Sequence, residues 1–187
     1  MASTCGLYYP MANAIVTMRV AHGVPQDKRT RPCPSHLACD LEGAVPAESS
    51  IRHRPSLSLV GARALIDAAV GQASEMGVAV TIVVVDESGV EKAAVRMDGA
   101  PLVSVQTATS KAYAAAAIGM PPDEFYAAIE PDGAAVASFA TRPGLALIAG
   151  GLPVVVEGDV VGGIGVAGAM TGAEDRHIAE NALGSLG

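Results

Sequence analysis

Two basic side chains lie close in the sequence to polar groups that could share a binding site with them. Arg96 and Asp98 come at the end of a strand-like run, and the helix-like segment that follows carries Thr107 and Lys111. Residues four positions apart lie on the same face of a helix, so Thr107 and Lys111 are expected to face the same way. A guanidinium and an ammonium together could hold a carboxylate or an enolate. The alternative is that Arg96 pairs with Asp98 at a strand end and that Lys111 is only solvated.

One motif imitates a nucleotide-binding fingerprint. Gly163, Gly165 and Gly168 satisfy the pattern G-x-G-x-x-G, but that fingerprint needs its glycines between a strand and a helix that open a βαβ unit. Here the first two glycines fall inside the last strand-like run, where they would permit close approach of a helix or a bulge. The chain also lacks G-x-S-x-G, Walker, H-E-x-x-H and C-x-x-C motifs. These patterns argue against a nucleotide site and against several common hydrolase and redox chemistries.

His177 is the only histidine after residue 55, and it lies beside Asp175 and Arg176 in the last helix-like segment. The ordinary interpretation is a solvated surface residue paired with neighbouring charges. The rival interpretation is an axial iron ligand or a general base, which requires the imidazole to face a pocket. All three cysteines precede residue 55, so a cysteine nucleophile in the later part of the chain is excluded.

Charge and composition narrow the classes of partner. The 187-residue chain has a formal net charge of −7, 50% hydrophobic residues, 3% aromatic residues and no Trp. An acidic chain repels a nucleic-acid backbone, and few aromatic rings are available to stack on bases. No apolar run approaches the ~18 residues that a membrane-spanning helix needs. We therefore expect an aliphatic core and neither a nucleic-acid nor a membrane partner.

A break in composition divides the chain near residue 55. Residues 1–55 carry six basic and four acidic side chains, whereas residues 56–187 carry six basic and fifteen acidic ones. The first part is rich in proline and lacks a sustained period, which predicts an irregular, mobile extension or a translation start placed too early. Cys33, His36 and Cys39 could bind zinc, but they lack paired spacing and a fourth ligand. An odd number of cysteines without an export signal favours the cytoplasm.

Residues 56–187 alternate between helix-like and strand-like patterns. Ser56 or Ser58 can cap the first helix and Gly77 can end it, while Thr171 and Glu174 form a capping box for the last one. The predicted elements are a helix at 59–76, strands at 78–85 and 90–97, a helix at 102–118, a shorter helix from 122, strands at 145–148, 153–156 and 160–166, and a helix at 173–183. This order predicts one largely antiparallel sheet with helices packed on it.

Five short blocks resemble those of a known family. They are 84–89, 96–100, 110–113, 150–153 and 162–168, followed by an acidic helix start at 174–175. In this order and at this spacing they are similar to the GlcG/HbpS family over the whole of residues 56–187. The resemblance implies an α+β, profilin-like fold with a five-stranded antiparallel sheet flanked by helices. It also implies homo-oligomers, often octamers.

The resemblance implies binding of heme or another tetrapyrrole as the first functional expectation. The side chains that could contact such a ligand are those of Tyr113, Tyr126, Met97 and His177, with His177 as the candidate iron ligand. The partner would then be heme or another small anionic molecule. A related expectation is an accessory oligomer that holds no small ligand at all.

A cofactor-free enzyme acting on a small carboxylate is the alternative. In such an isomerase, hydratase or lyase, Arg96 would clamp the carboxylate, Lys111 would stabilise negative charge and Asp98 would move a proton. The residues expected to bind the ligand are Arg96, Thr107, Lys111, Tyr113, Gly150 and Gly151. The expectation on which these roles depend is that Arg96 and Lys111 converge on one cavity.

Overall fold

The first helix follows the pattern of its sequence. The structure, a computed structural model, describes residues 52–186. Helix α1 (Leu59–Glu75) begins after Ser58, whose hydroxyl accepts a hydrogen bond from the Gly61 amide. It ends before Gly77, which adopts a left-handed φ of 69° that glycine tolerates without strain. The predicted helix, its serine cap and its glycine stop are confirmed.

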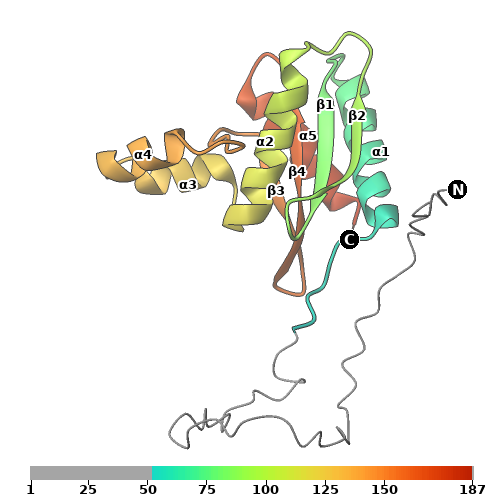
Figure 1. Cartoon of the computed structure of the whole chain (residues 1–187). Coiled ribbons are helices and arrows are strands. Elements are labelled where there is room, and N and C mark those ends of the chain that lie inside the picture. The colour runs from blue at the N-terminus through green and yellow to red at the C-terminus, as the bar shows by residue number, and fades with distance from the viewer. Residues whose placement is uncertain (1–51, 187) are drawn as a thin grey trace, which may run out of the picture. The chain divides into compact units, whose positions relative to one another are not determined.

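Four antiparallel strands form the sheet, and their order across it is β2-β1-β4-β3 (Figure 1). Strands β1 (Thr81–Asp86) and β2 (Glu91–Arg96) form one hairpin, and β3 (Gly151–Val156) and β4 (Asp159–Ala167) form the other. Strand β4 pairs with β1 and joins the two hairpins. This arrangement confirms the α+β class with a single antiparallel sheet.

The expected fifth strand is wrong for the described residues. Residues 145–148 are apolar, yet they run as irregular chain with no strand partner. Two glycines with left-handed backbone, Gly144 at φ 78° and Gly150 at φ 105°, bracket the segment. These glycines turn the chain near each end of the segment, which runs as a loop and leaves Ile148 exposed.

Helices cover the two faces of the sheet differently. Helix α1 and the last helix, α5 (Gly172–Gly184), pack against each other and on one face. This face holds the larger aliphatic cluster, which includes Leu65, Ile82, Ile164 and Ile178. Helix α2 (Val103–Ile118) covers the other face, mainly over β4. Aliphatic burial on both faces supplies the main driving force for folding, as the composition predicts.

Glycines in β4 bring α2 unusually close to the sheet. A Cβ atom on Gly163 would lie 2.5 Å from the Ala112 carbonyl oxygen, and one on Gly165 would collide with the Ala108 carbonyl oxygen. The residues of α2 that face these two glycines are Ala108, Ala112 and Ala116. The first two glycines of the G-x-G-x-x-G pattern therefore allow close packing of a helix on a strand, as predicted. They lie inside β4 and not between a strand and a helix, as a nucleotide-binding fingerprint requires.

Two short helices extend away from the sheet (Figure 1). They are α3 (Pro122–Ile129), which was predicted, and α4 (Gly133–Ala140), which was not. The rings of Phe125 and Phe139 meet edge to face at 5.1 Å, and the Arg142 guanidinium lies 4.9 Å from the Phe139 ring centre. Arg176 of α5 fixes α3 through Asp123 at 2.7 Å and through the neighbouring Glu124.

Several expectations lie outside the described residues. They are the mobile extension over most of residues 1–55 and the possible zinc ligands Cys33, His36 and Cys39. Within residues 52–186, no helix is both long and apolar enough to cross a membrane.

Candidate functional site

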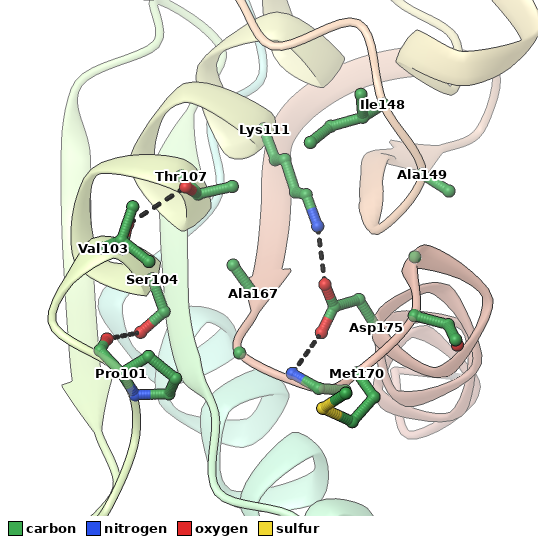
Figure 2. A pocket seen from close by; sticks show the side chains of 14 residues that line it. Pro101, Val103, Ser104, Thr107, Lys111, Ile148, Ala149, Ala167, Met170 and Asp175 are labelled. Carbon is green, nitrogen blue, oxygen red and sulfur yellow. Dashed lines mark hydrogen bonds and ion pairs between the residues drawn. The ribbon is translucent and has the colours of Figure 1, made fainter.

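A cavity of about 410 Å³ lies at one end of α2, where that helix, the end of β4 and the start of α5 meet (Figure 2). Helix α2 contributes Ser104, Thr107 and Lys111, and the irregular loop before β3 contributes Ile148 and Ala149. The full lining is Pro101, Val103, Ser104, Thr107, Lys111, Ile148, Ala149, Ala167, Gly168, Ala169, Met170, Thr171, Gly172 and Asp175. A volume of this size can hold a small molecule or part of a larger one.

A buried ion pair forms the floor of this cavity (Figure 2). Lys111 Nζ donates to Asp175 Oδ2 at 2.7 Å and to the Val166 carbonyl oxygen at 2.8 Å. The second carboxylate oxygen of Asp175 accepts from the Ala169 amide at 3.1 Å. The Lys111 side chain is only 2% exposed. The pair thus joins α2, the end of β4 and α5 at one point.

Burial acts on the protonation of this pair. Loss of solvent raises the pKa of the Asp175 carboxyl above its ordinary value, and the hydrogen bond from Lys111 opposes that rise. The carboxylate is therefore easier to protonate than an exposed aspartate would be.

Glycine is required behind the lysine. Gly150 has a φ of 105°, and a Cβ there would lie 2.8 Å from Lys111 Nζ and 2.7 Å from Asp175 Cβ. A Cβ on Gly151 would lie 2.6 Å from the Lys111 carbonyl oxygen. These two predicted ligand-binding residues hold Lys111 by close backbone approach, and neither lines the cavity.

Exposed apolar side chains surround the mouth of the cavity. Among the residues that line it, Val103 is 73% exposed, Ile148 51% and Met170 93%. Exposed apolar groups that gather at one place commonly mark a binding surface. The cavity therefore combines an apolar rim with a charged but internally neutralised floor.

The predicted convergence of Arg96 and Lys111 is wrong. Arg96 is exposed at the end of β2, and its guanidinium donates to the Ala100 carbonyl oxygen through Nε and Nη2. Neither Arg96 nor Asp98 lines the cavity, and no ion pair joins them among the described residues. The link from β2 to α2 folds back on itself, so the guanidinium is used to hold this turn. The alternative that Lys111 is merely solvated is also wrong.

The other predicted residues are divided between the cavity and the surface. Thr107 lines the cavity, although its hydroxyl donates to the Val103 carbonyl oxygen at 3.0 Å. Tyr113 is 39% exposed and lies farther along α2, against Gly89. His177 is exposed on α5 and does not line the cavity. Tyr126 and Met97 do not line it either.

Asp175 is the site residue that the sequence did not reveal. It follows the Thr171 capping box, and an acidic residue in the first turn of a helix is ordinarily explained by the helix dipole. Lys111 lies 64 positions earlier, so only the fold brings the two together. Met170 and Ile148 were missed for a similar reason, because isolated exposed apolar residues carry no signal in a sequence.

Comparisons with known proteins agree with this fold. The family model described as "Haem degrading protein HbpS-like" matches residues 57–184. The crystal structure of a double mutant of HbpS from Streptomyces reticuli has a TM-score of 0.69 and 33% sequence identity, over 78% of this chain and 95% of that one. A structure described as a PduOC:heme complex has a TM-score of 0.63 and 28% identity, over 70% and 94% of the two chains.

A curated relative is similar over almost its whole length. It is an uncharacterized 15.0 kDa protein from the dhaT-dhaS intergenic region of Citrobacter freundii, 32% identical over 129 residues, which are 68% of this chain and 90% of that protein. The family resemblance expected from the sequence blocks is confirmed: the chain belongs to the HbpS-like family.

Proposed function

We propose that this protein binds heme or a related tetrapyrrole at the cavity between α2 and α5. The observation that carries the proposal is the apolar rim formed by Val103, Ile148 and Met170 around a cavity of about 410 Å³. A porphyrin is a broad apolar plate with two carboxylates, so its face suits such a rim while its carboxylates stay in water. Support also comes from the description of the matching family and from the heme complex of PduOC.

The lining fits the macrocycle better than it fits the iron. Among the described residues of the lining, none is His, Cys or Tyr, and Met170 offers the one sulfur donor. A thioether is a known axial ligand for heme iron, and it is weaker than a thiolate or an imidazole in many settings. We therefore assign the apolar rim the main part in binding and Met170 the part of an iron donor.

Hemin titration tests this function directly. We expect a shifted Soret band that survives desalting of the full-length protein. Ile148→Asp introduces a charge into the rim and should weaken hemin binding about tenfold or more, because the apolar contact of one large side chain is worth about 1.5 kcal/mol. Met170→Ala should weaken binding and alter the Soret position. The matched control is Met120→Ala, since Met120 lies outside the cavity.

The same titration can refute the proposal. Absence of a Soret shift in wild-type protein at micromolar hemin would contradict heme binding. A band that Ile148→Asp, Met170→Ala and Met120→Ala leave equally intense would contradict its placement in this cavity.

A cofactor-free isomerase, hydratase or lyase is the second candidate, favoured by the buried Lys111–Asp175 pair at the cavity floor. In this version Asp175 takes over the proton transfer that the sequence assigned to Asp98, and Arg96 takes no part. We expect wild-type protein in D₂O to exchange carbon-bound protons of a two- to four-carbon hydroxy or oxo acid, measured by proton NMR. Exchange that persists unchanged in Lys111→Ala would contradict this function.

Homo-oligomers, including the octamers that the resemblance implies, remain part of the proposal. Helix α4 has no buried residue and no charged side chain, which is unusual for a helix surrounded by water. A second copy that covers it would remove that apolar surface. Light scattering coupled to size-exclusion chromatography gives the mass, and a monomeric mass at micromolar concentration would contradict this assembly.

A further inference from the structure

Lys111 has an unused bonding capacity at the edge of the cavity. Its ammonium carries three N–H bonds, and the described residues supply two acceptors, Asp175 Oδ2 at 2.7 Å and the Val166 carbonyl oxygen at 2.8 Å. The side chain is 2% exposed, yet it lines the cavity (Figure 2). A small molecule in the cavity therefore meets this amine in a place that bulk water reaches poorly.

A proton acceptor lies against the amine. Lysine is a nucleophile only after it loses a proton, and proteins achieve this by burial and by a neighbouring base. Asp175 Oδ2 is the nearest base, and its other oxygen is fixed by the Ala169 amide. The carboxylate is thus held in one orientation, toward the nitrogen.

We propose that Lys111 forms a covalent imine with a small aldehyde or ketone bound in the cavity, with Asp175 as the proton carrier. This inference does not depend on heme binding. It differs from the second candidate function, in which Lys111 only stabilises charge.

The step is balanced without a further reactant. The Lys111 ammonium passes one proton to Asp175, and the nitrogen lone pair forms a bond to the carbonyl carbon. The carbonyl oxygen takes up the second proton lost by the nitrogen and becomes the hydroxyl of a carbinolamine. Asp175 then returns its proton to that hydroxyl, the C–O bond breaks, and water leaves. The product is a protonated imine on Lys111, and neither carbon nor nitrogen changes its oxidation state.

The surroundings suit this chemistry. The net charge of the Lys111–Asp175 pair is zero, so a neutral carbonyl compound can enter without repulsion. Gly150 packs closely behind the nitrogen, on the side away from the cavity lining, and helps to hold the amine in place. The Lys111 side chain is only 2% exposed, which limits the contact of its nitrogen with the bulk water that would hydrolyse the imine.

Borohydride trapping tests the proposal with an internal control. The full-length protein is incubated with glycolaldehyde, or with dihydroxyacetone in a parallel sample, and sodium borohydride reduces any imine to a stable secondary amine. Peptide mass spectrometry then compares Lys111 with Lys92, an exposed lysine whose Nζ lies 3.8 Å from Asp86. We expect Lys111 to be labelled about a hundredfold faster than Lys92, because Asp175 is fixed at hydrogen-bond distance from Lys111 whereas the carboxylate of Asp86 is 3.8 Å from Lys92.

Two variants extend the test. Asp175→Asn removes the base and should slow labelling of Lys111 about a hundredfold, to a rate near that of Lys92. Lys111→Arg keeps the positive charge and should lose the adduct at this position while Lys92 is labelled as before. Circular dichroism identifies a variant that fails to fold, and the comparison within wild-type protein then decides. Labelling of Lys92 without faster labelling of Lys111 would overturn the proposal.

Discussion

Removing one member of the buried ion pair should destabilise the protein strongly. Lys111→Met replaces the ammonium with a thioether of similar length and leaves the Asp175 carboxylate, 7% exposed, without its partner. Loss of one partner from a buried pair costs about 3–5 kcal/mol. One kcal/mol corresponds to about 3–4 °C in the melting temperature of a domain of this size. We therefore expect the melting temperature to fall by roughly 10–20 °C.

A double-mutant cycle isolates the coupling between the two groups. Asp175→Asn keeps an oxygen for the Ala169 amide but leaves the ammonium unpaired. Combined with Lys111→Met, it removes both charges. The free energy of unfolding that the double variant loses should therefore be about 2 kcal/mol smaller than the sum of the two single losses. Urea denaturation followed by circular dichroism measures all four proteins.

The control is an exposed pair. Lys92→Met breaks the contact of Lys92 with Asp86 at 3.8 Å and should cost less than about 1 kcal/mol. Single losses at Lys111 and Asp175 that simply add, or that do not exceed the Lys92 value, would refute the interpretation of Lys111–Asp175 as a coupled buried pair.

Three further changes give measurable results. Gly165→Ala places a methyl against the backbone carbonyl of Ala108 and should lower stability by about 1–3 kcal/mol or more, or prevent folding, as measured by urea denaturation. Thr171→Ala removes the capping-box hydroxyl and should cost about 1 kcal/mol in the same measurement. The pKa of Glu87 lies below its ordinary value of 4.5, with the Ser56 side chain as the largest cause, so the stability that ionised Glu87 contributes is present above that ordinary value and is lost as the pH falls through the lowered one. Glu87→Gln should remove that part of the acid dependence, measured as the melting temperature between pH 3 and 6.

Local signals explain why most elements were predictable. The helix at 59–76 and the last helix have caps that act within a few residues, and the strands at 78–85 and 160–166 are apolar runs bounded by turns. The segment 145–148 has the same local character as a strand, but glycines with positive φ turn the chain near both of its ends. Whether such a short apolar run reaches the outer edge of β3 depends on the path of the whole loop, which the segment itself does not encode. Helix α4 was missed because eight small or apolar residues without charge give no amphipathic period.

The site was harder to predict than the fold. Lys111 was identified because basic residues are few after residue 55 and because it lies on a predicted helix. The groups that would share its site were sought nearby in the sequence, at Arg96 and Asp98. The turn after β2 uses Arg96 for its own hydrogen bonds to Ala100. The partner that the fold supplies is Asp175, brought across the molecule by α5. The spacing of residues in a sequence indicates which side chains share one face of a helix. It does not indicate which side chains meet where three elements come together.

Stability alone does not account for a lysine and an aspartate at this junction. Apolar side chains of similar volume in place of a buried ion pair often leave a protein equally stable or more so. The pair instead lies at the wall of a cavity, with one N–H bond of Lys111 unmatched by the described residues and a fixed carboxylate beside it. The fixed carboxylate serves a structural ion pair as well, but the unmatched N–H bond at the cavity wall has a use only if a bound molecule accepts it.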